Sequence, residues 1–130
     1  MAYEIPGLTL TLLSSGDMSA NQYKCVRASS ANADGGATLV ATRGGEVTGV
    51  WQDNSTAATY GKVMFTGVSK VMAGGGNAIT QGAVLVASSA GQAVPSTASG
   101  QHTIGFALES LSSDATGVIP VQLAIGAITT

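Results

Sequence analysis

The sequence predicts an all-β protein, and three observations lead to this prediction. Eighteen glycines are spread over 130 residues and separate short runs of β-branched residues. Many short strands joined by tight turns produce this pattern. No window places apolar residues at helical spacing between recognisable caps. The length fits one domain, so we expect an extended N-terminal arm and connection over residues 1–20, followed by one compact β domain over residues 21–130.

The first expected strand is Leu8–Leu13, where leucine and threonine alternate as they do in a half-buried strand. Further strands are expected at Tyr23–Ala28, Ala37–Thr42 and Glu46–Trp51. The last two flank Arg43-Gly44-Gly45, which has the composition of a tight turn. We therefore expect these two strands to pair as a hairpin.

Two more hairpins are expected in the middle of the chain. Lys62–Thr66 and Ser69–Met72 flank Gly67, which predicts a second hairpin around this glycine. Val84–Ser88 and Ala93–Pro95 flank a short polar turn, which predicts a third.

Thr103–Glu109 and Val118–Ala124 are the last expected strands, and the polar loop 112–117 joins them. Residues 52–60 are polar with weak patterning, so either a loop or a single helical turn is expected there. Residues 73–83 are expected to form a glycine-rich connection.

The charge content is low. Only 9% of the residues are charged, against about 25% in an average soluble domain. Five Lys/Arg residues do not make the basic stripe of a nucleic-acid-binding protein. The longest apolar stretch, residues 118–128, contains Pro120 and Gln122 and is shorter than the roughly 20 residues of a membrane-spanning helix. The N-terminus has no basic region, so we expect no signal peptide. We therefore expect no nucleic-acid or membrane partner, and a surface largely covered by protein partners.

The reactive residues do not predict an enzyme. Cys25 is the only cysteine, so no intrachain disulfide can form, and we expect a small buried side chain in a reducing compartment. His102 is the only histidine, and no Gly-x-Ser-x-Gly elbow accompanies it, so an exposed loop residue is expected. The scattered carboxylates do not form a zinc or calcium ligand cluster. We predict no catalytic, cofactor-binding or metal-binding residues. The enzymatic alternative is a small ligand-binding or hydrolytic β-barrel around His102.

Two glycine-containing segments match part of a nucleotide-binding motif, but neither motif is complete. Gly74-Gly75-Gly76 has Ile79 where the dinucleotide fingerprint requires its third glycine. Gly61-Lys62 is followed by Val63 rather than by serine or threonine, so the phosphate-loop motif is incomplete. Both segments are therefore expected to be turns without a cofactor.

The C-terminal half carries a recognisable pattern of small residues and turns. It consists of Ile79, Gly82, Leu85, Gly91 and Pro95, then Ile104–Ser110, then Val121–Leu123. Over about residues 62–124 the chain resembles the small capsid decoration (cement) proteins of tailed bacteriophages. The resemblance implies a β-barrel or β-tulip domain that binds the outer surface of a phage head and stabilises the expanded shell, without catalysis or cofactor.

The resemblance also implies partners and a location. The major capsid protein is the expected partner, and a homo-oligomer is expected, with a trimer favoured. The expected location is the capsid exterior, after synthesis in the host cytoplasm. Another virion structural protein, such as a tail-tube or fibre-base domain, remains the alternative.

Capsid contacts are expected mainly from the arm. The alternation in Leu8–Leu13 is typical of an edge strand, which can pair with a partner sheet. We therefore expect apolar contacts from the arm, and Trp51 as a further anchor. The residues expected to make these contacts are Ile5, Leu8, Leu10, Leu12 and Trp51. We also expect that residues 1–13 can be removed without unfolding the β domain.

Overall fold

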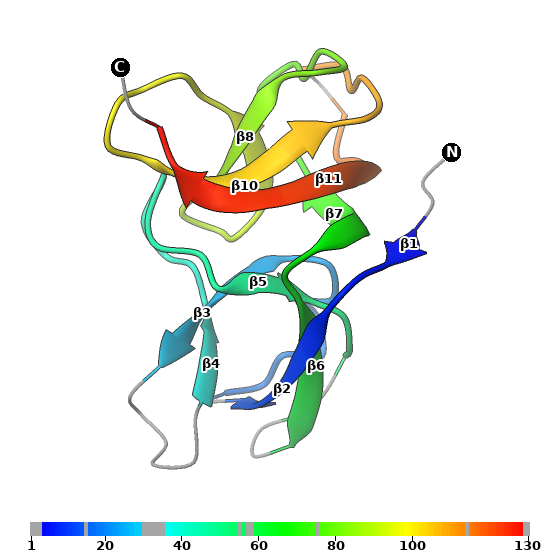
Figure 1. Cartoon of the computed structure of the whole chain (residues 1–130), viewed down its shortest axis with the longest axis vertical. Helices are drawn as coiled ribbons and strands as arrows, with labels where there is room; N and C mark the ends of the chain where they lie inside the picture. The colour runs from blue at the N-terminus through cyan, green and yellow to red at the C-terminus, as the bar shows by residue number, and fades with distance from the viewer. Residues whose placement is uncertain are drawn as a thin grey trace.

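A computed structural model describes residues 4–14, 16–29, 36–54, 56, 59–74, 76–113 and 115–128. All the regular secondary structure of this described part is β, in eleven strands. The all-β prediction is therefore confirmed. The strands form two units, a closed barrel and a separate sheet, which are stacked along the long axis of the molecule (Figure 1).

The first unit is a barrel of five short strands. The strands lie in the order β2-β4-β3-β5-β6, and the barrel closes between β6 and β2. All neighbours are antiparallel except β2 and β4, which are parallel. The strands are β2 (Thr9–Ser14), β3 (Cys25–Ser29), β4 (Gly36–Leu39), β5 (Gly49–Trp51) and β6 (Tyr60–Met64).

The second unit is a six-stranded sheet in the order β1-β7-β11-β10-β8-β9. One parallel bridge between Ala73 and Ala93 joins β7 to β9, so the five strands other than β1 curl into a ring. The strands are β1 (Ile5–Pro6), β7 (Gly67–Ala73), β8 (Val84–Ala87), β9 (Ala93–Pro95), β10 (His102–Ala107) and β11 (Gly117–Ala127).

The hairpin expected from Val84–Ser88 and Ala93–Pro95 is confirmed, because β8 pairs antiparallel with β9. The last two strands, β10 and β11, also pair antiparallel with each other. The hairpin expected around Arg43-Gly44-Gly45 is wrong, because β4 and β5 lie on opposite sides of β3. The turn instead docks on the second unit. Gly44 N donates to the carbonyl of Ala87, and the carbonyl of Gly44 accepts from His102 N.

The hairpin expected around Gly67 is also wrong. Strands β6 and β7 do not pair with each other; β6 pairs with β2 and β5, whereas β7 pairs with β1, β11 and β9. Only Phe65 and Thr66 separate the two strands. The chain bends there and continues from the barrel into the sheet, and Gly67 takes a positive φ of 90° at the bend.

An extended N-terminal arm is not confirmed. Within residues 1–20, β1 pairs with β7 and β2 pairs with β6 and β4. Because β2 is one of the five barrel strands, removing residues 1–13 would open the barrel wall. The expectation that this segment can be deleted without unfolding the domain does not fit this arrangement.

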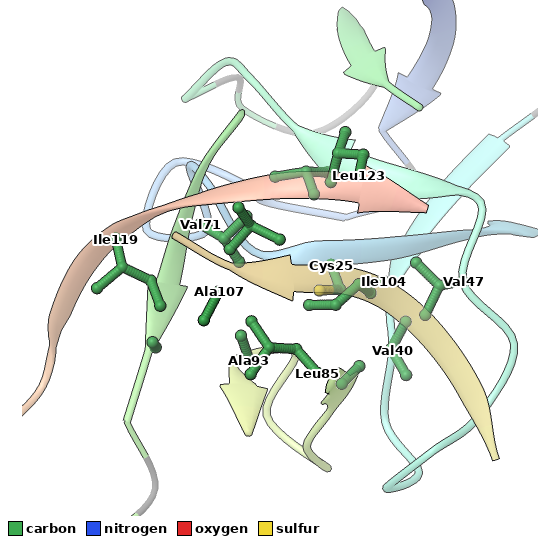
Figure 2. Packing of buried hydrophobic residues seen from close by; sticks show 14 of the residues in the cluster. Cys25, Val40, Val47, Val71, Leu85, Ala93, Ile104, Ala107, Ile119 and Leu123 are labelled. Atoms are coloured by element: carbon green, nitrogen blue, oxygen red, sulfur yellow. The ribbon is translucent and has the colours of Figure 1, made fainter. Parts of the chain in front are cut away.

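The larger hydrophobic core joins the two units. Cys25, Val40 and Val47 of the first half lie in the same buried cluster as Leu85 and Ile104 of the sheet (Figure 2). A smaller cluster fills the barrel itself, with Leu10 and Leu12 packed against it. Its buried members are Met18, Val26, Ala37, Trp51 and Val63. The barrel and the sheet therefore share buried surface and form one body.

Trp51 fills the barrel because Gly61 leaves room for it. The indole is fully buried, and its Nε1 has no hydrogen-bond partner in the described part of the chain. A Cβ atom on Gly61 would lie 2.4 Å from Cζ2 and 2.6 Å from Cη2 of the ring. A side chain at residue 61 therefore cannot coexist with the present position of the indole.

Gly61→Ala is expected to destabilise the protein by about 1–3 kcal/mol, because overpacking must displace the indole or the backbone. Gly117→Ala is the matched control, since Gly117 also lies in a strand and has no atom within 4 Å of an added Cβ. Urea unfolding followed by the fluorescence of Trp51, the only tryptophan, measures both. Equal midpoints for the two variants would contradict the packing of Trp51 on Gly61.

Cys25 is expected to be unreactive in the native protein. Its side chain is fully buried, and burial raises the pKa of the thiol to about 12. At pH 8 the native thiol is therefore both protonated and inaccessible, so an aromatic disulfide reagent should label it only after urea is added. Above pH 9 the unfolded thiol ionises and the native one does not, so this group lowers stability as pH rises toward 12. Rapid labelling without urea would contradict the burial of Cys25.

Candidate partner-binding edge

The N-terminal segment runs along both units: β1 pairs with β7 of the sheet, and β2 pairs with β6 of the barrel. We call these two consecutive strand pairs the ribbon. Ile5 lies opposite Val68 and Leu13 lies opposite Tyr60, and the paired residues between them keep the same register. At the bend, Phe65 N donates to the carbonyl of Leu8 (3.1 Å), and Leu8 N donates to Thr66 Oγ1 (2.7 Å). Figure 1 shows this segment in blue beside the green β6 and β7.

Gly7 lies where the ribbon passes from the sheet to the barrel. A Cβ atom on Gly7 would lie 2.1 Å from the carbonyl oxygen of Thr66. Glycine is therefore required for the close approach of the two backbones at this point. The close approach lets the chain pass from β1 on the sheet to β2 on the barrel through Gly7 and Leu8, which belong to neither ladder.

The backbone groups of β2 alternate between its two edges. Ser14 N donates to the carbonyl of Thr59, and the carbonyl of Leu8 accepts from Phe65, so the even-numbered residues face β6. The N–H and C=O groups of Thr9 and Thr11 therefore point to the opposite edge. Strand β4 pairs there only with Leu13 and Ser14, so within the described residues the edge from Thr9 to Thr11 is unpaired.

The outer edge of β1 is different. Pro6 has no N–H, so the pair Pro6–Gly67 cannot be a mutually hydrogen-bonded pair, and the backbone of Ile5 faces β7. The residue of β1 whose backbone points away from β7 is therefore Pro6, and Pro6 has no N–H to donate to a partner strand. Proline protects an edge strand against pairing, so the edge available to a partner strand is that of β2.

The expected contact residues are placed in three environments. Ile5 and Leu8 are on the surface, 58% and 64% exposed. Leu10 and Leu12 are half-buried and pack against the barrel core. Trp51 lies inside that core and has no exposed surface, so it cannot contact a partner directly. The structure thus brings Ile5, Leu8, Thr9 and Thr11 together as a surface, which we call the N-terminal edge.

Two exposed aromatic side chains were not among the expected contacts. Tyr60 on β6 is 57% exposed, and Phe106 on β10 is 43% exposed. Phe106 points outward although Ile104 and Ala107 are buried, because a register shift between Thr103 and Gly105 interrupts the alternation of β10. Gly105 was the sequence signal for this irregularity, since a glycine inside a strand pattern often marks a bulge.

One ion pair lies next to the N-terminal edge. Lys70 Nζ is 3.6 Å from Glu4 Oε1, and it also lies 5.7 Å from the centre of the Tyr23 ring. Both charged side chains are partly exposed, so the pair contributes at most about 1 kcal/mol. Its effect is to leave little unbalanced charge beside β1.

The groups considered for catalysis do not come together in the described part of the chain. His102 is the first residue of β10 and is half-buried, so the expectation of an exposed loop residue is wrong. A depression of about 260 Å³ lies beside β3 and is lined by Arg27, Val40, Ala41, Thr42, Gly45 and Glu46, without histidine, cysteine or serine. No group of three or more histidine, cysteine or acidic side chains among the described residues is placed to hold a metal ion.

No helix capable of spanning a bilayer occurs within the described ranges. The pKa of the Asp17 carboxyl is lowered because the carboxylate accepts hydrogen bonds from Ser19, chiefly from its backbone N–H. The N-terminal edge, in contrast, combines outward backbone groups at Thr9 and Thr11 with the exposed side chains of Ile5 and Leu8, which suits contact with a protein partner.

Comparison with known proteins gives a family and a similar fold. No curated protein matches the chain. The N-terminal base of the head fibre gp8.5 of bacteriophage phi29 has a similar crystal structure, with a TM-score of 0.68, 14% sequence identity, and coverage of 90% of this chain and 93% of that one. A family profile described as phage cement protein matches residues 15–123, which is most of the chain. The resemblance seen in the C-terminal half is confirmed, and the chain belongs to the phage cement protein family.

Proposed function

We propose that this protein is a capsid decoration (cement) protein that binds the outer surface of a phage head and stabilises the expanded shell. Its partner is the major capsid protein, and it acts on the capsid exterior after synthesis in the host cytoplasm. Membership of the cement protein family supports this proposal. The single observation that carries its mechanism is the β2 edge at Thr9 and Thr11, which no described strand pairs with, beside the exposed Ile5 and Leu8.

The edge can bind an extended segment of the coat protein by strand addition. Thr9 and Thr11 each offer one donor and one acceptor, and each bond formed contributes about 0.5–1.5 kcal/mol net. Covering Ile5 and Leu8 contributes on the order of 1.5–3 kcal/mol for each side chain that becomes fully buried. The hydrogen bonds and the buried apolar side chains would thus contribute binding free energies of similar size. Neither contribution requires a reacting group or a cofactor. We accordingly propose a structural role without catalysis.

The protein acts in this proposal as a homo-oligomer, with a trimer favoured by the family resemblance. Several copies held together would bind several coat subunits at once. Linked binding events raise the overall affinity well above that of one contact. A weak contact at the β2 edge of each copy would then be enough to keep the oligomer bound to the shell.

A second candidate is a fibre-base domain of the virion, which the fold favours because it is similar to the base of the phi29 head fibre. Electron microscopy of purified particles separates the two candidates. Density distributed over the faces of the head supports decoration of the shell, whereas density only beneath fibres supports the fibre base.

Thr11→Pro tests the edge mechanism. Proline removes the outward N–H of residue 11 but no hydrogen bond to β6, so the barrel is expected to remain folded. Binding to purified heads that lack the protein should fall at least about tenfold in a co-sedimentation assay, because a ladder donor is lost and the ring hinders a partner strand. Thr11→Val is the matched control, since it keeps the N–H and the β-branched shape.

Equal denaturation midpoints would show that the variants are equally stable. A difference in head binding between them would then reflect the binding surface and not unfolding. If Thr11→Pro does not fold, Thr9→Pro tests the same edge one step along the strand. Leu8→Asp keeps the whole backbone edge and tests the apolar contact separately, with weaker binding expected. A folded proline variant that binds heads as tightly as the Thr11→Val variant would exclude strand addition at this edge.

A further inference from the structure

A row of outward side chains crosses four strands of the second unit. Val68 on β7 lies opposite Gln122 on β11, Gln122 lies opposite Phe106 on β10, and Phe106 lies opposite Val84 on β8. Residues directly opposite each other in a sheet project to the same face. The adjacent Ser69, Val121, Ala107 and Leu85 are all buried. The four residues Val68, Gln122, Phe106 and Val84 therefore lie on the outer face, and we call them the outer row.

The outer row is more apolar than an ordinary surface. Gln122 and Phe106 are exposed, with Phe106 at 43%, and the two valines are half-buried. Ile5, opposite Val68, extends the row at one end with another exposed apolar side chain. An exposed aromatic residue among aliphatic ones, without a charge, is the composition of an interface core.

The charges of the chain are distributed unequally between its halves. Residues 67–130 contain only three charged residues, Lys70, Glu109 and Asp114, and the first 66 residues contain the other nine. Asp114 lies outside the described residues. Lys70 is already paired with Glu4. The sheet, which carries the outer row, therefore has too little net charge to attract an oppositely charged partner.

We infer that the outer row is the surface on which a second copy of this chain docks. Two identical surfaces repel each other where they carry net charge. The outer row carries none, and Lys70, two residues from Val68 on the same strand, is paired with Glu4. The carboxamide of Gln122 both donates and accepts, so Gln122 side chains from copies around a two-fold or three-fold axis can bond to one another. Phe106 of one copy can then cover Val68 or Val84 of the next.

The size of the face fits the central part of such an interface. The outer row crosses four strands about 4.8 Å apart, so it is on the order of 15 Å long. A standard interface covers about 800 Å² on each partner. The outer row would form its apolar centre, and the flanking loops would supply a polar rim.

This contact is separate from the binding of the shell. The backbone edge of β2 belongs to the barrel, whereas the outer row belongs to the sheet. The β2 edge and the four residues of the outer row can therefore be covered by different partners, and the two surfaces adjoin at Ile5. The inference deepens the homo-oligomer of the proposed function by naming the surface through which copies meet, and its sedimentation test requires no capsid, so it can fail independently of shell binding.

Sedimentation equilibrium of the full chain, over a range of concentrations, tests the inference. The wild type is expected to form an oligomer. Gln122→Glu changes an exposed amide to a carboxylate of the same shape, so it should weaken association at least about tenfold at pH 7 by placing like charges in contact. Association should return near pH 3, where a carboxyl group is largely protonated.

Phe106→Glu is a second variant, and Tyr60→Glu is its matched control because Tyr60 is an exposed aromatic residue on the barrel. The first should dissociate the oligomer and the second should not. Wild-type protein that stays monomeric at about 1 mM, or Gln122→Glu protein that associates as the wild type does, would overturn the inference. So would a monomeric wild type whose Phe106→Glu variant loses binding to heads, because the coat protein would then be the occupant of this face.

Discussion

The shared core between barrel and sheet is the constraint on which the other features depend. Cys25, Val40 and Val47 are buried in the same cluster as Leu85 and Ile104, so neither unit can bury its apolar residues alone. Tyr23 adds a backbone connection: its N donates to the carbonyl of Trp51 and its carbonyl accepts from Met72, each at 2.7 Å. Its φ of 67° is unfavourable for a non-glycine residue, and these two bonds, one to each unit, compensate for that cost.

A rigid body of this kind changes how a partner strand would be bound. Leu10 and Leu12 pack against the barrel core, which fixes the orientation of β2 and keeps the backbone groups of Thr9 and Thr11 directed outward. A flexible arm would have to be ordered on binding, at a cost in conformational entropy for every residue. The barrel has already ordered this strand during folding. The proposed edge is therefore preorganised, and small contacts on it can be effective.

The sequence predicted the fold class and one hairpin but not the other strand pairings. The pairing of β8 with β9 was predicted correctly, because a short turn joins the two strands. At Gly44 and Gly67 the glycine signal was real, since both adopt positive φ. The predicted partners were wrong because other strands occupy the places between them. Strand β3 lies between β4 and β5, and the N-terminal strands β1 and β2 lie beside β7 and β6. For the contact residues, alternation predicts an apolar face but not whether the protein's own core or a partner covers it. Ile5 and Leu8 are exposed, whereas Leu10, Leu12 and Trp51 pack inside.

The low charge content of the chain reflects how its charged residues are distributed between the two units. Had the twelve charged residues been spread evenly, every face would be equally suited to water. Instead nine of them lie in the first 66 residues, and the sheet unit presents Phe106 and Gln122 with hardly any charge around them. Charged residues keep a protein soluble before assembly, and here the barrel supplies most of them. The sheet is thereby free to be apolar where copies would meet. A surface that only had to face solvent would gain nothing from this division, so the division itself favours a protein that functions in contact with its neighbours.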